Sequence, residues 1–244
     1  MALPKLTTPT YELEVPSTDE KIQFRPFLVK EEKILLIAME SGKNEDIIEA
    51  VKQIVSGCTF NKLKLSTLPM FDVEYIFLQI RAKSVGEVSK LKLLCPDDNK
   101  TYGEVEVKLD EVKVQVDEGH TNKIELDNEM GMIMTYPNID SFKASGITTI
   151  TASNMLDVIS TCILQIYEQK GEKVYEAKDQ TRKELTDFIE SLQSKHFKKV
   201  QHFFDTMPKL KHTVKVKNPK TKKESEIVLA GLNDFFQSPF HTII

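Results

Sequence analysis

The chain has 244 residues, of which 40% are apolar and 29% charged, and its formal net charge at pH 7 is −4. This length suffices for one large domain or two small ones with a buried core. The slightly negative charge excludes a general electrostatic attraction to nucleic acid or to an anionic membrane, so binding to either requires a local basic patch.

The cysteines and the chain start are typical of a protein made in a reducing cytoplasm. Cys58, Cys95 and Cys162 are widely spaced and form no C-x-x-C pair, which argues against a disulfide framework or a zinc ribbon. The first residues lack the apolar run of a secretory signal, and no run of about 18 apolar residues occurs. We therefore expect neither general export nor a membrane span.

Residues 1–28 are expected to form an N-terminal β arm or hairpin. Tyr11–Val15 and Lys21–Phe24 alternate apolar and polar residues around a turn at Pro16–Asp19. Because proline donates no backbone hydrogen bond, these strands belong at a sheet edge. Two readings stay open: a partner extends this edge, or the hairpin packs on its own domain.

Residues 29–146 are expected to form helices followed by an antiparallel β meander. Apolar residues at positions 34–38 predict a first helix, and those at 47–55 predict a second helix after a cap at Asn44. Residues 71–80 are apolar nearly all round, which indicates a central helix or one covered by a partner. From Glu87 the apolar period changes to two, which predicts a hairpin and then short strands as far as Tyr136.

Residues 147–244 are expected to form a second lobe of helices with a C-terminal β-hairpin, so the predicted fold class is α+β. Asn154 is expected to cap a helix over Met155–Tyr167 that ends at Gly171. Thr181 and Glu184 match a capping box for the next helix. A further helix is expected from residue 194 to Pro208, then a hairpin over residues 212–229 and a final apolar turn.

Motifs for phosphate, dinucleotide, zincin and nucleophile-elbow sites are absent, so no catalytic residue, cofactor or metal ligand is predicted. His196 and His202 lie six positions apart, which favours surface histidines over a metal pair. Cys95–Asp98 favours a plain hairpin turn. Glu104 and Glu106 share one strand face, which we interpret as its solvent side.

The two lobes differ in local charge. Lys209–Lys223 holds seven lysines and no acid, whereas Glu104–Glu129 holds nine acids. Complementary patches of this kind speed encounter in ordered assembly. Edge-strand lysines that prevent aggregation explain the basic run equally well. Nucleic-acid binding is not expected, because the run lacks arginine and stacking aromatics.

Three blocks of the sequence stand out: Arg25–Ala38, Arg81–Gly86 with Cys95–Pro96 after it, and Phe203–Leu210 with the hairpin that follows. These blocks resemble the baseplate hub and hub-assembly proteins of T4-like bacteriophages. The resemblance implies a non-enzymatic tail protein in baseplate hub assembly, as a hub subunit or an assembly chaperone. It implies other baseplate or hub proteins as partners, and a location in the host cytoplasm during assembly and in the virion tail for a retained subunit.

The resemblance and the charge pattern together nominate six partner-binding residues. They are Phe27, Leu28, Phe77, Arg81, Lys215 and Lys217. A cell-envelope hydrolase associated with the tail hub is the alternative function, and it requires a concave cluster of acids with one raised pKa.

Overall fold

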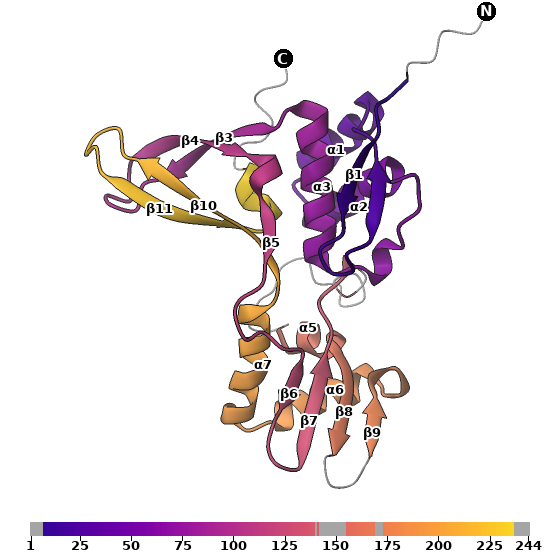
Figure 1. Cartoon of the computed structure of the whole chain (residues 1–244). Helices are drawn as coiled ribbons and strands as arrows, with labels where there is room; N and C mark the ends of the chain where they lie inside the picture. The colour runs from indigo at the N-terminus through magenta and orange to yellow at the C-terminus, as the bar shows by residue number, and fades with distance from the viewer. Residues whose placement is uncertain (1–6, 140, 142–154, 169–172, 237–244) are drawn as a thin grey trace, which may run out of the picture. The chain divides into compact units, whose positions relative to one another are not determined.

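The computed structural model describes residues 7–139, 141, 155–168 and 173–236 (Figure 1). The chain folds into two compact units. Unit 1 comprises Met1–Leu65, Phe71–Gln115 and Lys209–Ile244, and unit 2 comprises Ser66–Met70 and Val116–Pro208. Both units combine helices with small antiparallel sheets, so the α+β class predicted from sequence is confirmed.

The units follow a different division of the chain from the segments 1–28, 29–146 and 147–244 expected from sequence. The chain leaves unit 1 after Gln115 and returns at Lys209. The cause is a pairing between distant segments: β5 (Lys113–Gln115) pairs antiparallel with β10 (Lys209–Lys217), with Val114 opposite Leu210. A pairing across more than ninety residues leaves no local signal in the sequence.

The N-terminal hairpin of unit 1 is confirmed. Strands β1 (Tyr11–Glu14) and β2 (Lys21–Phe24) pair antiparallel, in a two-stranded sheet of their own. Their alternation buries Leu13, Ile22 and Phe24 and exposes the polar residues between them. The hairpin therefore packs one face on its own unit, which was one of the two readings left open by the sequence.

Three helices follow in unit 1: α1 (Val29–Ser41), α2 (Asn44–Cys58) and α3 (Met70–Val85). The expected cap at Asn44 is wrong by one position, because α2 begins at Asn44 and Lys43 is the N-cap. Helix α3 is the central helix, as predicted. Its buried residues are Phe71, Asp72, Val73, Ile76, Phe77, Leu78, Ile80 and Ala82.

The expected continuous meander is wrong, because its strands separate into three sheets. The hairpin of β3 (Val88–Leu94) and β4 (Tyr102–Lys108) is confirmed and forms one sheet. The second sheet has the order β11-β10-β5, where β11 (Glu224–Ala230) completes the predicted C-terminal hairpin. The remaining predicted strands lie in the sheet of unit 2.

Unit 1 packs β4 closely against β10 at Gly103. A Cβ atom at this position would lie 2.4 Å from Cγ2 of Val216 and 2.8 Å from the carbonyl oxygen of Lys217. The second of these atoms belongs to backbone, so only glycine permits this approach. The shared core includes Leu91, Leu93, Val107, Leu109, Leu210, Val214, Val216, Leu229 and Phe235.

The described residues of unit 2 form a four-stranded antiparallel sheet and the helices α5, α6 and α7. Its strand order is β6 (Lys123–Glu125), β7 (Met130–Met134), β8 (Ile163–Glu168) and β9 (Val174–Glu176). The helices are α5 (Met155–Thr161), α6 (Arg182–Ser191) and α7 (Ser194–Thr206). The core joins them through Ile124, Met132, Met134, Ile159, Ile163, Ile166, Leu185, Ile189, Val200 and Phe203.

The predicted helix over Met155–Tyr167 is wrong in its second half. Helix α5 ends at Thr161, and the chain continues as β8, which buries Ile163 and leaves Leu164 49% exposed. Pairing with β7 overrides the helical spacing of these apolar residues. The expected cap and end of that helix, at residues 154 and 171, lie outside the described residues.

Local signals in the C-terminal half are confirmed. The Thr181 hydroxyl accepts a hydrogen bond from the Glu184 N–H at 3.2 Å, and the Glu184 carboxylate accepts one from the Thr181 N–H at 2.7 Å. Helix α7 starts at Ser194 and stops before Pro208. The final apolar turn is a 3-10 segment, η4 (Leu232–Phe236).

Candidate functional site

The first two sequence blocks meet at the N-terminus of α1. The Phe27 N–H donates a hydrogen bond of 2.9 Å to Oγ of Ser84, near the end of α3. Ser84 in turn donates to the carbonyl of Ile80 at 2.5 Å. On the other side, the Arg25 N–H donates to the carbonyl of Cys58, the last residue of α2, at 3.0 Å. Segment 25–27 is therefore held between the ends of two helices.

A nearly buried ion pair fixes the same segment. One Nη atom of Arg25 lies 2.8 Å from Oε1 of Glu31, and their side chains are only 12% and 6% exposed. The other Nη atom donates to the carbonyl of Pro26 at 2.9 Å. The Glu31 carboxylate also accepts a 2.8 Å hydrogen bond from the Leu28 N–H at the start of α1. A carboxylate in this position also complements the positive end of the helix dipole.

Burial raises the pKa of Glu31, but hydrogen bonds from Arg25 and from the Leu28 N–H, with the Arg25 charge, outweigh it. The net pKa lies below its usual value. Glu31 is therefore ionised in the folded chain, and its charge orients the start of α1.

Two further acids of α3 hold backbone segments in place. Asp72 is fully buried and accepts hydrogen bonds from the N–H of Ser17, at 3.1 Å, and from the Ser17 hydroxyl. Burial raises the pKa of Glu74 to about 7, and a hydrogen bond from the Leu232 N–H partly opposes this. These acids thus anchor the N-terminal hairpin and η4 to the central helix.

The structure separates the four partner-binding residues predicted in the N-terminal half. Phe27 and Phe77 are 9% and 2% exposed, so they pack in the core of unit 1. Burial lowers the pKa of the half-buried Arg81. Leu28 is 40% exposed. Of these four, Leu28 presents the largest apolar surface to solvent.

The two predicted lysines lie on the exposed face of β10. Lys215 and Lys217 are opposite Glu226 and Glu224 of β11, and Nζ of Lys215 lies 4.0 Å from the Glu226 carboxylate. The basic run seen in the sequence is therefore balanced by acids across the hairpin. Exposed pairs of this kind contribute little to stability, on the order of 0–1 kcal/mol.

Helix α1 exposes an apolar row that the sequence analysis missed. Val29, Leu36 and Ile37 are 79%, 42% and 56% exposed, whereas Leu35 and Ala38 face the core. Positions 29 and 36 are two turns apart and lie on one side of the helix, with position 37 beside them. We call these three residues the α1 outer row. The sequence held one signal of this row, namely more apolar residues in α1 than one buried face can use. Neighbouring positions such as 35 and 36 point in different directions from a helix, so one of them is left outside the core.

A family model described as "T4 bacteriophage base plate protein" matches residues 8–237, which span both units. The chain belongs to this baseplate family. No curated protein and no solved structure gave a match. Within the described part of the chain, no helix is both long and apolar enough to cross a membrane.

The candidate catalytic acids of this baseplate protein are solvated ion-pair partners. Glu104 and Glu106 face solvent on β4, and their carboxylates lie 3.6 and 3.3 Å from Nζ of Lys92 and Lys90. Their alternation marks the solvent side of the strand, as interpreted from sequence. In the ranges that the structure describes, no group of three or more His, Cys, Asp or Glu could hold a metal ion.

The Cys95–Asp98 segment is a hydrogen-bonded turn that ties two hairpins together. The Asp98 carboxylate accepts bonds from the N–H groups of Lys100 and Thr101 at 3.0 and 2.9 Å. The Asp97 carboxylate accepts bonds from Nδ2 of Asn218 at 2.9 Å and from the Thr221 hydroxyl at 2.5 Å. These bonds lower the pKa of Asp97. The third resemblance block's hairpin is thereby joined to the second block.

The histidines of unit 2 differ in their surroundings. The expectation of a surface histidine is wrong for His196, which is buried with an Nε2 atom that has no hydrogen-bond partner among the described residues. His202 is exposed, as expected. His120, which the sequence analysis did not single out, contacts Thr206 and Tyr136 through its two ring nitrogens at 3.0 and 2.9 Å. Burial, and then repulsion from His202, lower the pKa of His120.

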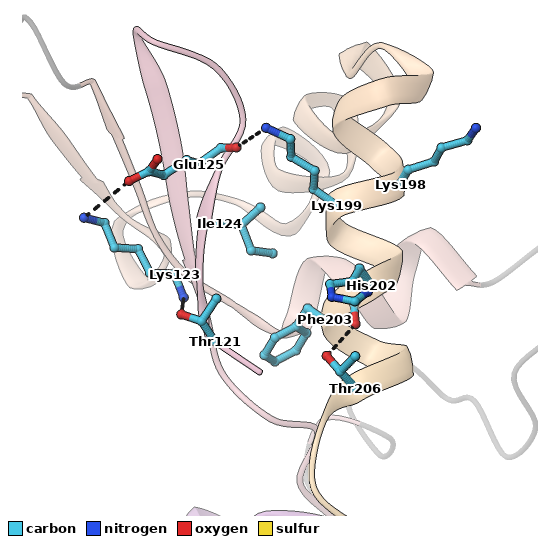
Figure 2. Close-up of a pocket in the computed structure, with 9 residues that line it drawn as sticks. All are labelled: Thr121, Lys123, Ile124, Glu125, Lys198, Lys199, His202, Phe203 and Thr206. Atoms are coloured by element: carbon cyan, nitrogen blue, oxygen red, sulfur yellow. Dashed lines mark hydrogen bonds and ion pairs between the residues drawn. The ribbon is translucent and has the colours of Figure 1, made fainter. Parts of the chain in front are cut away.

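Unit 2 carries an open groove of about 300 Å³ between β6 and α7 (Figure 2). Its centre is lined by Ile124 and Phe203. The lysine heads around it are engaged or turned away: Lys199 donates to the Glu125 carbonyl at 2.7 Å, and Lys198 points outward. The groove therefore offers an apolar floor, and we assign no reaction to it.

Proposed function

We propose that this baseplate protein acts in assembly of the baseplate hub, without catalysing a reaction, through protein–protein contacts of unit 1. The observation that carries the proposal is the α1 outer row, Val29, Leu36 and Ile37, which the described part of the chain leaves exposed. It lies in the helix that belongs to the first resemblance block. Membership of the baseplate family suggests other phage proteins as partners, and we propose baseplate proteins among them.

The start of α1, where the outer row begins, is held by several contacts, which suits a docking surface. The Arg25–Glu31 ion pair and the bond between Phe27 and Ser84 fix the start of α1 against α2 and α3. A preformed surface spends less conformational entropy on binding. Covering the exposed part of each outer-row side chain contributes about 1 kcal/mol. Leu36 and Ile37 are neighbours in this row, and the charged residues Glu32 and Lys33 lie between them and Val29. Apolar surface with a polar rim marks interaction sites in soluble proteins.

The test disables the gene for this chain in the phage and restores it with variants. We expect the disabled phage to lack normal hubs, and the wild-type chain to restore them. Leu36→Glu places a charge in the outer row and should fail to restore hubs. Leu164→Glu is the matched control, because Leu164 is a comparably exposed leucine, 49% against 42%, in unit 2. Normal infectious particles from the disabled phage would refute the proposal.

A retained hub subunit and a transient assembly chaperone differ in one observable. A subunit remains in purified mature tails at a fixed ratio to other baseplate proteins, and mass spectrometry of virions detects it there. A chaperone is found in the host cytoplasm with assembly intermediates and is absent from the tails. Both modes use the same contact surface.

A further inference from the structure

Helix α2 ends in a conformation that its sequence disfavours. The N–H of Asn61 donates to the carbonyl of Ser56 at 2.8 Å, the bond that closes a Schellman C-terminus. This closure requires a left-handed residue after the C-cap Thr59, and that residue is Phe60, with φ +60°. Asn61 follows at φ +57°. Glycine is the usual residue at this position, and a bulky aromatic there is an outlier.

The Phe60 ring gains only part of the burial that its size offers, because the residue is 41% exposed. A strained backbone at an exposed aromatic does not serve packing well. Strained residues cluster at binding sites, where the surrounding structure holds them in place. Aromatic side chains are also the commonest anchors of protein interfaces.

Phe60 lies at the same end of the helix pair as the start of α1. The backbones of Arg25 and Cys58 are joined by a 3.0 Å hydrogen bond, and the carboxylate of Glu31 lies 3.7 Å from where a Cβ on Gly57 would stand. The first residues of α1 therefore adjoin the last turn of α2. Leu28 and Val29, 40% and 79% exposed, bring further apolar surface to this end.

Cations surround this apolar end. The Lys30 side chain is 69% exposed, and Lys62 is exposed two residues after Phe60. The Glu31 carboxylate lies within 3.3 Å of Lys30 and 2.8 Å of Arg25, so one acid is shared between two cations. Glu32 lies in the same turn, so Arg25, Lys30 and Lys62 stand against two acids, and the local formal charge is +1 although the whole chain carries −4. Such a surface favours an acidic partner and disfavours a basic one.

We propose that Phe60, with Leu28 and Val29, forms an anchor site for an acidic segment of another baseplate protein that carries an apolar side chain. We call these three residues the Phe60 anchor. The inference rests on the proposed function and adds the chemistry of the partner. The apolar side chain covers the ring, and carboxylates of the segment face Lys30 and Lys62.

The test uses extracts of cells infected with a phage that cannot make this chain, complemented with the purified full-length protein. Phe60→Gly removes the ring and suits the left-handed backbone, and thermal unfolding checks that the variant folds. We expect it to lower the yield of infectious particles about tenfold or more. Tyr102→Ala is the control, because Tyr102 is a 59% exposed aromatic elsewhere in unit 1.

A second variant tests the partner's charge without touching the ring. Lys62→Glu should also lower the yield, and more strongly at low salt than at high salt. If Phe60→Gly and Tyr102→Ala give the same yield of infectious particles, the Phe60 anchor is refuted. If Phe60→Gly lowers the yield and Lys62→Glu does not, the proposal that the partner segment is acidic is refuted. If the wild-type chain forms a dimer and Phe60→Gly dissociates it, the site binds a second copy of this chain. That result also refutes the proposed binding of another baseplate protein. If even the wild-type chain adds nothing, the proposed function itself has failed.

Discussion

Replacing Glu31 by glutamine is the sharpest test of how the start of α1 is held. The substitution keeps the size of the side chain and removes its charge. Arg25 then keeps its bond to the Pro26 carbonyl but loses its 2.8 Å ion pair in a site where its side chain is only 12% exposed. The Leu28 N–H also loses a charged acceptor.

The expected loss of stability in unit 1 is about 2–4 kcal/mol, because breaking a buried pair leaves the other charge uncompensated. The matched control is Glu106→Gln. Its carboxylate lies 3.3 Å from Nζ of Lys90, against 2.8 Å in the Arg25 pair, and the side chains of Glu106 and Lys90 are 67% and 81% exposed. There we expect a loss below about 0.5 kcal/mol. Burial is the larger difference between the two pairs, because the first is 12% and 6% exposed and the second 81% and 67%.

The assay is hydrogen exchange of backbone amides in α1, followed by mass spectrometry at neutral pH. A loss of about 3 kcal/mol raises the opening constant about 100-fold, so α1 amides should exchange faster by that factor in Glu31→Gln. The Glu31 pKa is lowered by folding, so its contribution is present above its ordinary value and fades as pH falls through the folded value. Equal α1 exchange in Glu31→Gln and Glu106→Gln would refute this reasoning.

Three further predictions concern other parts of the chain. Gly103→Ala should destabilise unit 1 by about 1–3 kcal/mol in denaturant unfolding, because the new Cβ meets β10 backbone, whereas Gly57→Ala, which meets nothing closer than 3.7 Å, should not. Folding raises the pKa of Glu74 from 4.5 to about 7, so the stability of unit 1 should fall as pH rises across that range. Glu74→Gln should abolish this fall. A wild-type stability that does not change with pH in this range would contradict the burial of the acid. Folding lowers the pKa of His120, so unit 2 should lose stability as pH drops below about 6.5, and His120→Asn should remove this dependence. Thermal unfolding from pH 5 to 8 measures the pH dependence due to Glu74 and that due to His120.

Elements with local signals could be predicted from the sequence. The capping box of Thr181 and Glu184 and the hairpin around residues 95–100 depend on residues within a few positions of each other. The helix expected over 155–167 failed, because apolar residues at helical spacing also suit a strand whose neighbour, β7, is distant in sequence. The pairing of β5 with β10 likewise depends on tertiary structure alone.

The partner-binding residues nominated from sequence stay predictions, and the structure shows only which of them reach solvent. The first block was expected to carry the partner surface, and Leu28 does face solvent. Phe27 and Phe77 turn inward because burial of large aromatics dominates the free energy of folding. The strain at Phe60 could not be foreseen, since the sequence gives no φ angle and phenylalanine is not a residue expected at a left-handed helix end.

The central claim is that the α1 outer row contacts another baseplate protein. Site-specific photocrosslinking tests it most directly, with a photoreactive residue at position 36 of the full-length chain in infected cells and, as control, at position 164. We expect position 36 to yield a crosslink that mass spectrometry assigns to a single baseplate protein, while position 164 yields none to that protein. Equal crosslinking from both positions, or none from position 36 in cells that assemble normal hubs, would contradict the claim.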